Sequence, residues 1–329
     1  MLTERLPRVR LAHLPTPLEP LPRLSAELGG PQLWIKRDDQ TGLATGGNKA
    51  RKLEFLVAEA LAGGATTLIT AGAPQSNHAR QTAAAAAKCG LRAILVLGGG
   101  PPTQARSGGN VLIDGLLGAE IRWAEGSDRA QVMSEVAAEE RAAGRRPYVV
   151  PYGGSNPVGA SGYVAALEEL AEQMAERSLH VDHVVFATSS GGTQAGMAVA
   201  AKALDFPAHI VGISVDREAA QLQSELAVLA KETADHLGLD LTLAPEEFIV
   251  RDEYCSAGYG VLTRAEREAI QLMARSEGVL VDPVYTARAL AGLVDLIRRG
   301  TFTPEETVCF WHTGGTPGIF AYGEALLEE

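Results

Sequence analysis

The chain contains few cysteines, few aromatic residues and no long apolar run. Its three cysteines, Cys89, Cys255 and Cys309, lie far apart and form no C-x-x-C pair, which excludes a disulfide framework and a zinc ribbon. No stretch reaches the length that crosses a bilayer, and the charged, proline-containing start of the chain does not match a signal peptide. We therefore expect a cytoplasmic protein that does not bind membranes.

Basic residues are outnumbered by acidic ones, and the formal net charge is −11. This charge argues against a sequence-independent nucleic-acid binder, so we expect no nucleic-acid partner. A local basic site for a small anion is still compatible with it. His180 and His183 could bind a metal in principle, but no third ligand stands at a suitable spacing, and we predict no metal site.

Three common functional fingerprints are also missing. The chain has no G-x-G-x-x-G or G-x-x-x-x-G-K-[ST] motif, which counts against a nicotinamide dehydrogenase and a P-loop protein. No serine has glycine two places before it and two after it, so the nucleophile elbow of a serine hydrolase is absent as well.

Short apolar segments alternate with longer helical patterns along the 329 residues. The alternation indicates βαβ units, so we predict an α/β fold with a mainly parallel sheet and helices on both of its faces. The length favours two lobes, with boundaries at turn-rich points near residues 50 and 155. The predicted strands span 32–37, 66–71, 92–97, 120–123, 147–150, 182–187, 209–215, 279–281 and 307–311. The predicted helices span 24–28, 49–62, 77–88, 110–117, 128–143, 162–175, 217–237, 262–275 and 286–298, with another at 194–203.

The glycine-rich loop before Lys49 is the first candidate site. Gly46 and Gly47 allow backbone angles that a side chain would block, and they place Lys49 at the start of a helix. The positive end of a helix disfavours a second positive charge, which helps to make a lysine amine available for covalent chemistry with a carbonyl group. The alternative is a glycine cap followed by solvated basic residues.

Three further glycine-bearing loops stand where a strand ends and a helix begins, which is where open α/β sheets bind ligands. They are 72–78, 189–193 and 312–316. The second of these, Ser-Ser-Gly-Gly-Thr, combines backbone donors, hydroxyls and a helix start, and it could hold a phosphate. It could equally be a capping cluster. A lysine and a phosphate cradle without a dinucleotide fingerprint suggest pyridoxal phosphate.

Eight sequence blocks follow one another along the chain: LPTPLEPLPRLS, WIKRDDQTG, GGNKARKLE, QSNHARQTAA, SSGGTQAG, GYGV, VDPVYTARALAGLVDLI and HTGGTPGIF. Together they resemble the tryptophan-synthase-β-like (fold type II) pyridoxal-phosphate enzymes. More narrowly, the chain resembles the family of D-cysteine desulfhydrase and 1-aminocyclopropane-1-carboxylate (ACC) deaminase. The resemblance implies an α/β fold with two open, mainly parallel twisted sheets flanked by helices. It also implies a large, discontinuous cofactor-binding domain at 1–50 and 161–329, a small α/β domain at 51–160, and a homodimer.

The resemblance also implies roles for individual residues. Lys49 would carry the cofactor covalently and remove the substrate α-proton. Thr313 would lie beside the pyridine nitrogen, and Asn77 would bond the 3′-oxygen. Tyr259 and Tyr285 would face the substrate near its leaving group, although both could simply be packed aromatics. The phosphate is expected at Ser190, Gly191, Gly192 and Thr193, and the substrate carboxylate at Ser76, Asn77, His78 and Asn48. Arg80 and Lys52 could be supporting charges or surface residues.

One departure from the family pattern favours a particular reaction. In ring-opening ACC deaminases a glutamate follows the tyrosine of DPVY, whereas Thr286 follows Tyr285 here. A neutral hydroxyl near the pyridine nitrogen supports a weaker electron sink than a carboxylate does, which suits β-elimination. We therefore expect C–S cleavage of D-cysteine, or of a similar β-substituted amino acid, to pyruvate, ammonia and hydrogen sulfide. The alternatives are ACC deamination, a sulfo-lyase acting on L-cysteate, and a catalytically silent protein that binds the cofactor or an amino acid.

Overall fold

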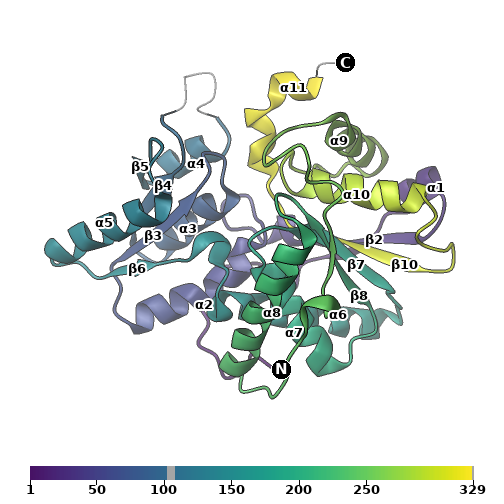
Figure 1. Ribbon diagram of the computed structural model, residues 1–329, viewed down its shortest axis with the longest axis horizontal. Helices are drawn as coiled ribbons and strands as arrows, with labels where there is room; N and C mark the ends of the chain where they lie inside the picture. The colour runs from purple at the N-terminus through teal and green to yellow at the C-terminus, as the bar shows by residue number, and fades with distance from the viewer. Residues whose placement is uncertain (102–107, 328–329) are drawn as a thin grey trace.

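Two β-sheets flanked by helices form the protein (Figure 1). The computed structural model describes residues 1–101 and 108–327. The larger sheet has six strands in the order β1-β2-β10-β7-β8-β9, and the smaller has four in the order β5-β4-β3-β6. Apart from the antiparallel pair of β1 and β2, the pairings in both sheets are parallel. This confirms the predicted fold class.

The strands are β1 (Leu18–Pro20), β2 (Gln32–Arg37), β3 (Thr67–Gly72), β4 (Arg92–Leu97), β5 (Glu120–Trp123), β6 (Pro147–Val149), β7 (His183–Thr188), β8 (His209–Ser214), β9 (Ile249–Arg251) and β10 (Thr307–His312). The helices are α1 (Pro22–Leu28), α2 (Lys49–Ala62), α3 (Asn77–Lys88), α4 (Asn110–Leu116), α5 (Arg129–Ala142), α6 (Pro157–Arg177), α7 (Gly192–Leu204), α8 (Ala219–His236), α9 (Arg264–Glu277), α10 (Thr286–Arg298) and α11 (Gly323–Leu327). Short 3₁₀ helices are η1 (Asp38–Gln40), η3 (Tyr152–Gly154), η4 (Pro245–Glu247) and η5 (Thr316–Ala321).

The central strands of both sheets are apolar on both faces because helices cover both faces. In β7, Val184 packs towards α6, α7 and α8, whereas its neighbour Val185 packs towards α9 and α10. In β3, Leu68 faces α2 and α3, and Ile69 faces α5. Successive side chains of a strand point to opposite faces, so each strand contributes to two cores. The near-continuous apolar runs seen in the sequence follow from this arrangement.

Helix α2, which begins at Lys49, packs tightly against α6. A Cβ atom on Gly162 of α6 would lie 2.5 Å from the backbone oxygen of Arg51 in α2. Only glycine permits this approach of one helix backbone to the other. The two helices pack against each other along their length, and their contact fixes where the first turn of α2 stands.

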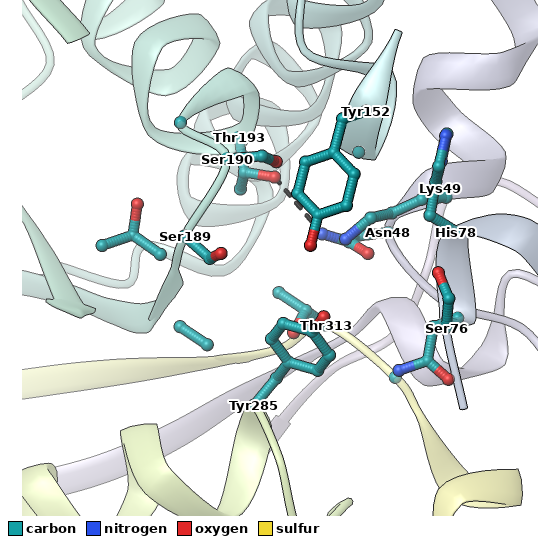
Figure 2. A pocket seen from close by; sticks show the side chains of 16 residues that line it. Asn48, Lys49, Ser76, His78, Tyr152, Ser189, Ser190, Thr193, Tyr285 and Thr313 are labelled. Atoms are coloured by element: carbon teal, nitrogen blue, oxygen red, sulfur yellow. Dashed lines mark hydrogen bonds between the residues drawn. The ribbon is translucent and has the colours of Figure 1, made fainter. Parts of the chain in front are cut away.

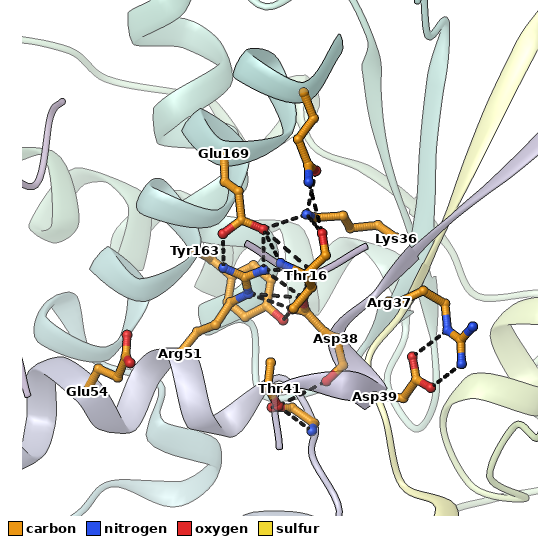
Figure 3. Close-up of polar contacts among 12 residues, drawn as sticks. Thr16, Lys36, Arg37, Asp38, Asp39, Thr41, Arg51, Glu54, Tyr163 and Glu169 are labelled. Atoms are coloured by element: carbon orange, nitrogen blue, oxygen red, sulfur yellow. Dashed lines mark hydrogen bonds and ion pairs between the residues drawn. The ribbon is translucent and has the colours of Figure 1, made fainter. Parts of the chain in front are cut away.

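A buried network of charges holds the same turn in place (Figure 3). The Arg51 guanidinium contacts Asp38, which follows β2, at 2.8 Å and Glu169 of α6 at 2.9 Å. The Tyr163 hydroxyl donates to Asp38 at 2.6 Å, and Lys36 pairs with Glu169. Burial acts to raise the pKa of Glu169, but the charges of Arg51 and Lys36 outweigh it and lower this pKa to about 2. The network therefore ties β2, α2 and α6 together.

Three details of the predicted elements need correction. The segment 279–281 is not a strand, because its backbone joins no ladder. Val279 and Val281 are buried, Leu280 is exposed, and the Leu280 backbone oxygen accepts from His312 Nε2 at 2.9 Å. Helix α6 begins at Pro157 rather than at residue 162, with Asn156 as its N-cap. The short strands β1 and β9 were not predicted. The proposed domain limits at residues 50 and 160 stay a prediction, with which the strand membership of the two sheets is compatible.

The described part of the chain bears on two functional features. Over residues 1–101 and 108–327, no helix combines the length and the apolarity needed to cross a membrane. Over the same ranges, no three His, Cys, Asp or Glu side chains are grouped so as to hold a metal ion. His180 contacts Asp182, and His183 contacts Glu306.

Candidate active site

A cavity lies where strands of both sheets end and the next helices begin (Figure 2). The end of β7, the end of β10 and the starts of α2 and α3 all contribute to it. This is the position at which open α/β sheets bind their ligands. Its lining residues are Asn48, Lys49, Ser76, Asn77, His78, Tyr152, Gly153, Ala187, Thr188, Ser189, Ser190, Gly191, Thr193, Tyr285, Thr313 and Gly314.

Lys49 is the first residue of α2, and its amine lies 5.6 Å from the centre of the Tyr285 ring. The preceding loop needs glycine at position 47, where φ is +130° and a Cβ atom would meet Gln81. Burial lowers the pKa of Lys49 to about 8, with Asp282 opposing this effect and Arg80 adding to it. A substantial fraction of the amine is therefore neutral near pH 8, as a nucleophile or a base requires.

The loop between β7 and α7 forms a polar cradle on the same cavity. Ser190 Oγ lies 2.8 Å from Ser155 Oγ, and Asn48 Nδ2 donates to Thr193 Oγ1 at 3.3 Å. A Cβ atom on Gly192, the first residue of α7, would lie 2.6 Å from Ser155 Oγ. The Gly192 N–H donates to Ser155 Oγ at 3.1 Å. The hydroxyls and the helix N-terminus together favour an anion here. Asn48 precedes Lys49, so the cradle and the lysine lie close enough to serve one ligand.

Lys52 adds a buried amine beside this cradle. Its side chain is 1% exposed, and its amine donates to the Gly153 oxygen at 3.0 Å and to Ser155 Oγ at 3.4 Å. Burial and then the charge of Lys49 lower its pKa well below the usual lysine value, and no carboxylate within the described ranges offsets them. A buried lysine without a counter-charge calls for an anion. The surface role considered for Lys52 and Arg80 is wrong, since Arg80 is also fully buried.

The start of α3 brings three expected substrate contacts to the cavity. Ser76 caps the helix, its hydroxyl accepting from Ala79 N at 3.1 Å, and Asn77 and His78 follow. His78 Nε2 lies 2.8 Å from Thr70 Oγ1. Burial, with the charges of Lys49 and Lys52, lowers the pKa of His78 well below its usual value. The imidazole is therefore neutral and brings no charge to the cavity.

Tyrosines close the opposite side of the cavity. Tyr285 lines it, whereas Tyr259 does not and instead reaches the site through Tyr285, with 2.7 Å between the two hydroxyl oxygens. Burial raises the pKa of both phenols above the ordinary tyrosine value. Both hydroxyls therefore remain protonated at neutral pH and can donate. Tyr152 of η3 also lines the cavity, and its ring lies above that of Tyr285 in Figure 2.

None of the sixteen lining residues is acidic. Thr313, which follows β10, is 7% exposed and lines the cavity. Thr286, at the position where ring-opening ACC deaminases carry glutamate, is committed elsewhere: its hydroxyl donates to Asp282 Oδ1 at 2.7 Å and accepts from Asp282 N at 2.6 Å. A heterocyclic nitrogen in this cavity would meet hydroxyl groups rather than a carboxylate.

The residues fit pyridoxal phosphate on three counts. Lys49, with its lowered pKa, and the loop of Ser190, Gly191 and Thr193 line one cavity. The buried Lys52 amine, which has no counter-charge within the described ranges, lies beside it on Gly153 and Ser155. The anion site, the amine and the neutral hydroxyl at Thr313 correspond to the three parts of that cofactor.

Some lining residues were not identified from the sequence, among them Tyr152 and Gly153. The turn cluster at 151–159 was interpreted only as a domain boundary. It follows β6, which lies parallel to β3 in the small sheet. Strands that run parallel end at the same edge, and this rule could have placed Tyr152 and Gly153 beside the loop that follows β3.

Comparisons with known proteins agree with these features. A family model described as "Pyridoxal-phosphate dependent enzyme" matches residues 9–314. The chain is 46% identical over 322 residues to a protein named D-cysteine desulfhydrase from Klebsiella pneumoniae subsp. pneumoniae, covering 97% of each chain. It is 45% identical over 323 residues to the protein of that name from Klebsiella pneumoniae strain 342, again covering 97% of each.

Solved structures show the same likeness. A protein described as an ACC deaminase homologue is 42% identical, with a TM-score of 0.89, and the match covers 99% of this chain and 97% of that one. The threonine deaminase of T.th. has a TM-score of 0.64 at 23% identity, covering 91% of this chain and 92% of that one. O-ureido-L-serine synthase has a TM-score of 0.65 at 17% identity, covering 95% and 93%. The last two matches show a shared fold.

Proposed function

The chain belongs to the family of pyridoxal-phosphate-dependent enzymes, and from this premise we propose that it is a C–S lyase acting on D-cysteine or a similar β-substituted amino acid. D-cysteine and water would give pyruvate, ammonia and hydrogen sulfide. The names of the two Klebsiella relatives support the choice of substrate. The absence of an acidic side chain from the cavity lining carries the choice of elimination.

The proposal assigns cofactor contacts to residues that surround the cavity. The phosphate would be held by Ser190, Gly191, Gly192 and Thr193, with the Lys52 ammonium as its counter-charge. Lys49 would bond to the aldehyde carbon, Asn77 to the ring oxygen, and the Thr313 hydroxyl would lie at the ring nitrogen. When bound, pyridoxal phosphate supplies an electron sink for the pair released at the substrate α-carbon.

The chain's own groups would perform the remaining steps. Ser76, Asn77, His78 and Asn48 would bind the substrate carboxylate and orient the amino acid. The Lys49 amine, with its pKa of about 8, would take the α-proton. The Tyr285 hydroxyl, supported by its bond to Tyr259, would donate a hydrogen bond to the departing sulfur. A neutral hydroxyl environment at Thr313 favours prompt expulsion of the β-substituent over a long-lived charge on the cofactor ring.

ACC deamination is the second candidate, because the structural neighbour at 42% identity is described as an ACC deaminase homologue. That reaction opens a ring and has no β-leaving group, so it needs a deeper sink than the neutral hydroxyls here provide. A sulfo-lyase acting on L-cysteate would use the same elimination with sulfite leaving. A silent binding protein is disfavoured because Lys49 and the cradle meet in one cavity.

Parallel assays of keto-acid release from D-cysteine, L-cysteine, cysteate and ACC test the proposal. We expect pyruvate and sulfide from D-cysteine and a yellow purified protein. Lys49→Ala should lose turnover by more than about a thousandfold, because the base and covalent anchor are one residue. Oxobutanoate from ACC with no sulfide from D-cysteine would refute the first choice. A colourless protein that takes up no added cofactor would refute the whole assignment.

We also propose a homodimer in the cytoplasm that binds a small amino acid and no nucleic acid. Large exposed apolar side chains at Leu112 and Leu116 of α4 and at Phe320 of η5 support self-association. The net charge of −11 supports the lack of nucleic-acid binding. Light scattering of the purified enzyme would give the mass in solution and would contradict the dimer if it returned the 34.6 kDa of one chain.

A further inference from the structure

Asn110, the first residue of α4, lies behind the cavity rather than in it. It is fully buried, and α4 packs against α3 (Figure 1). Its backbone N donates to Gln75 Oε1 and its Nδ2 donates to the Gln75 backbone oxygen, both at 2.8 Å. The same Nδ2 donates to Asn77 Oδ1 at 2.9 Å. Asn110 therefore holds the segment that presents Ser76 and Asn77 to the cavity.

Arg80 completes the arrangement from the next turn of α3. Its Nη1 donates to Asn77 Oδ1 at 2.9 Å and to Asn110 Oδ1 at 2.6 Å, and its Nη2 donates to the Gly46 oxygen at 2.7 Å. Burial lowers the pKa of Arg80 to about 10, with Asp114 and Asp282 opposing this effect. The guanidinium thus stays protonated near neutral pH and acts only as a donor.

These contacts determine the orientation of two side-chain amides. Arg80 can only donate, so the group that Asn110 turns towards it must be the oxygen, and the Asn110 amino group must face Gln75 and Asn77. Asn77 then receives two donors on its oxygen. Its own amino group points away from Arg80 and Asn110, and none of the hydrogen bonds within the described ranges uses it. An inverted Asn77 would set its amino group against two other donors.

We propose that Asn110 is a positioning residue: together with Arg80 it fixes Asn77 so that an amino group, and not a carbonyl, faces the ligand cavity. A donor at that point matches an anionic ring oxygen and repels a cation. The inference rests on the proposed function, because the ring oxygen belongs to the cofactor. Arg80 also holds the Gly46 oxygen, three residues before Lys49, so the same group supports both the donor and the lysine loop.

The test compares cofactor affinity in a double-mutant cycle of Asn110→Asp and Asn77→Ala. Aspartate keeps the oxygen that faces Arg80 but cannot donate to Asn77. We expect Asn110→Asp to raise the Kd for pyridoxal phosphate about tenfold, the value of one good hydrogen bond, and to shift the absorption maximum of the bound cofactor. In the Asn77→Ala background the same change should alter Kd by less than about twofold.

Thr82→Val is the matched control, because Thr82 is an equally buried α3 residue whose hydroxyl has no partner within the described ranges. It should leave Kd and the absorption maximum unchanged. An equal loss of affinity from Asn110→Asp in both backgrounds would overturn the proposal, since it would show a general structural effect. An unchanged Kd in the wild-type background would overturn it as well.

Crystal structures of the wild type and of Asn110→Asp, both without cofactor, test the orientation of Asn77 independently of the proposed function. We expect the Asn77 side chain to rotate in the variant, and an unchanged position with the same contacts to Arg80 would overturn the positioning role. Failure of the wild type to bind pyridoxal phosphate would instead overturn the proposed function, and the crystallographic comparison would still decide the orientation of Asn77.

Discussion

Asp114 of α4 offers a sharp test of the electrostatics around the site. Its side chain is fully buried, and within the described ranges neither of its carboxylate oxygens has a hydrogen-bond partner. Burial, partly offset by Arg80, raises its pKa from 3.8 to about 7. An acid whose pKa is raised by folding binds its proton more tightly in the folded state. Folding is therefore penalised once the pH exceeds 3.8, and the penalty stops growing above about pH 7.

The size of the penalty follows from the shift. A raised pKa of about three units corresponds to roughly 4 kcal/mol at pH 8, and about 1.4 kcal/mol of it develops between pH 6 and pH 8. Asp114→Asn keeps the shape and removes the charge. Its buried amide adds a cost of about 1–3 kcal/mol if unpaired, but that cost does not vary with pH. The variant should therefore gain stability relative to the wild type as the pH rises.

Urea unfolding of both proteins at pH 6, 7 and 8, at one saturating cofactor concentration, measures this difference. Groups common to both proteins cancel, so the change in the difference between pH 6 and pH 8 reports Asp114 alone. Asp240→Asn, which removes an exposed carboxylate, is the control. A difference that stays constant within about 0.5 kcal/mol across the range would refute the reasoning.

Three other substitutions test the packing and charge described above. Lys52→Met should stabilise the cofactor-free protein by about 1–3 kcal/mol, because it removes a buried amine that has no counter-charge. The same variant should raise the cofactor Kd at least about tenfold in a fluorescence titration. A variant that is less stable without cofactor, or that binds the cofactor as tightly as the wild type, would contradict the role of Lys52 as a counter-charge. Gly162→Ala places a Cβ atom 2.5 Å from the Arg51 oxygen. A thermal melt should therefore show a loss of about 2–4 kcal/mol in the free energy of unfolding. An unchanged melting temperature would show that the contact between α2 and α6 does not require glycine at this position. Glu169→Gln removes the negative charge that Arg51 and Lys36 share, and it should lower the free energy of unfolding by about 3–5 kcal/mol at pH 7. Folding lowers the pKa of Glu169 from 4.5 to about 2, so this loss should shrink as the pH falls from 4.5 to 2. A loss that does not depend on pH would contradict the ion pair as its cause.

Most of the fold could be predicted because its central strands have a sequence pattern that is easy to recognise. Segments such as Thr67–Gly72 and His183–Thr188 are short, apolar and ended by turn formers, as strands buried on both faces are. The segment 279–281 has the same composition without being a strand. A loop that packs two valines into the core has that composition as well, and a sequence does not show whether a neighbouring strand accepts the hydrogen bonds. The strands β1 and β9 have three residues each, too few to show a period.

The site was predictable where it consists of glycine-bearing loops at strand ends. Lys49 and the 189–193 cradle were found in this way, and the structure places them on one cavity. The burial of Lys52 was not predictable, because it depends on the Gly153 oxygen, a contact between residues 101 positions apart in the chain. Asn110 was missed for the same reason, since nothing near it in sequence indicates that its amide lies behind Asn77.

The place of β10 between β2 and β7 bears on how the protein is made. A ribosome delivers β2 early, whereas β10 and Thr313 follow only after residue 306. The large sheet consequently stays split during synthesis, with one edge of β2 and one edge of β7 awaiting their shared neighbour. The small sheet uses strands from 67–149 alone and is free to assemble first. Thr313 and Gly314 complete the cavity, so pyridoxal phosphate can bind there only after β10 has been translated. Until then, the free edges of β2 and β7 can pair with the wrong strands.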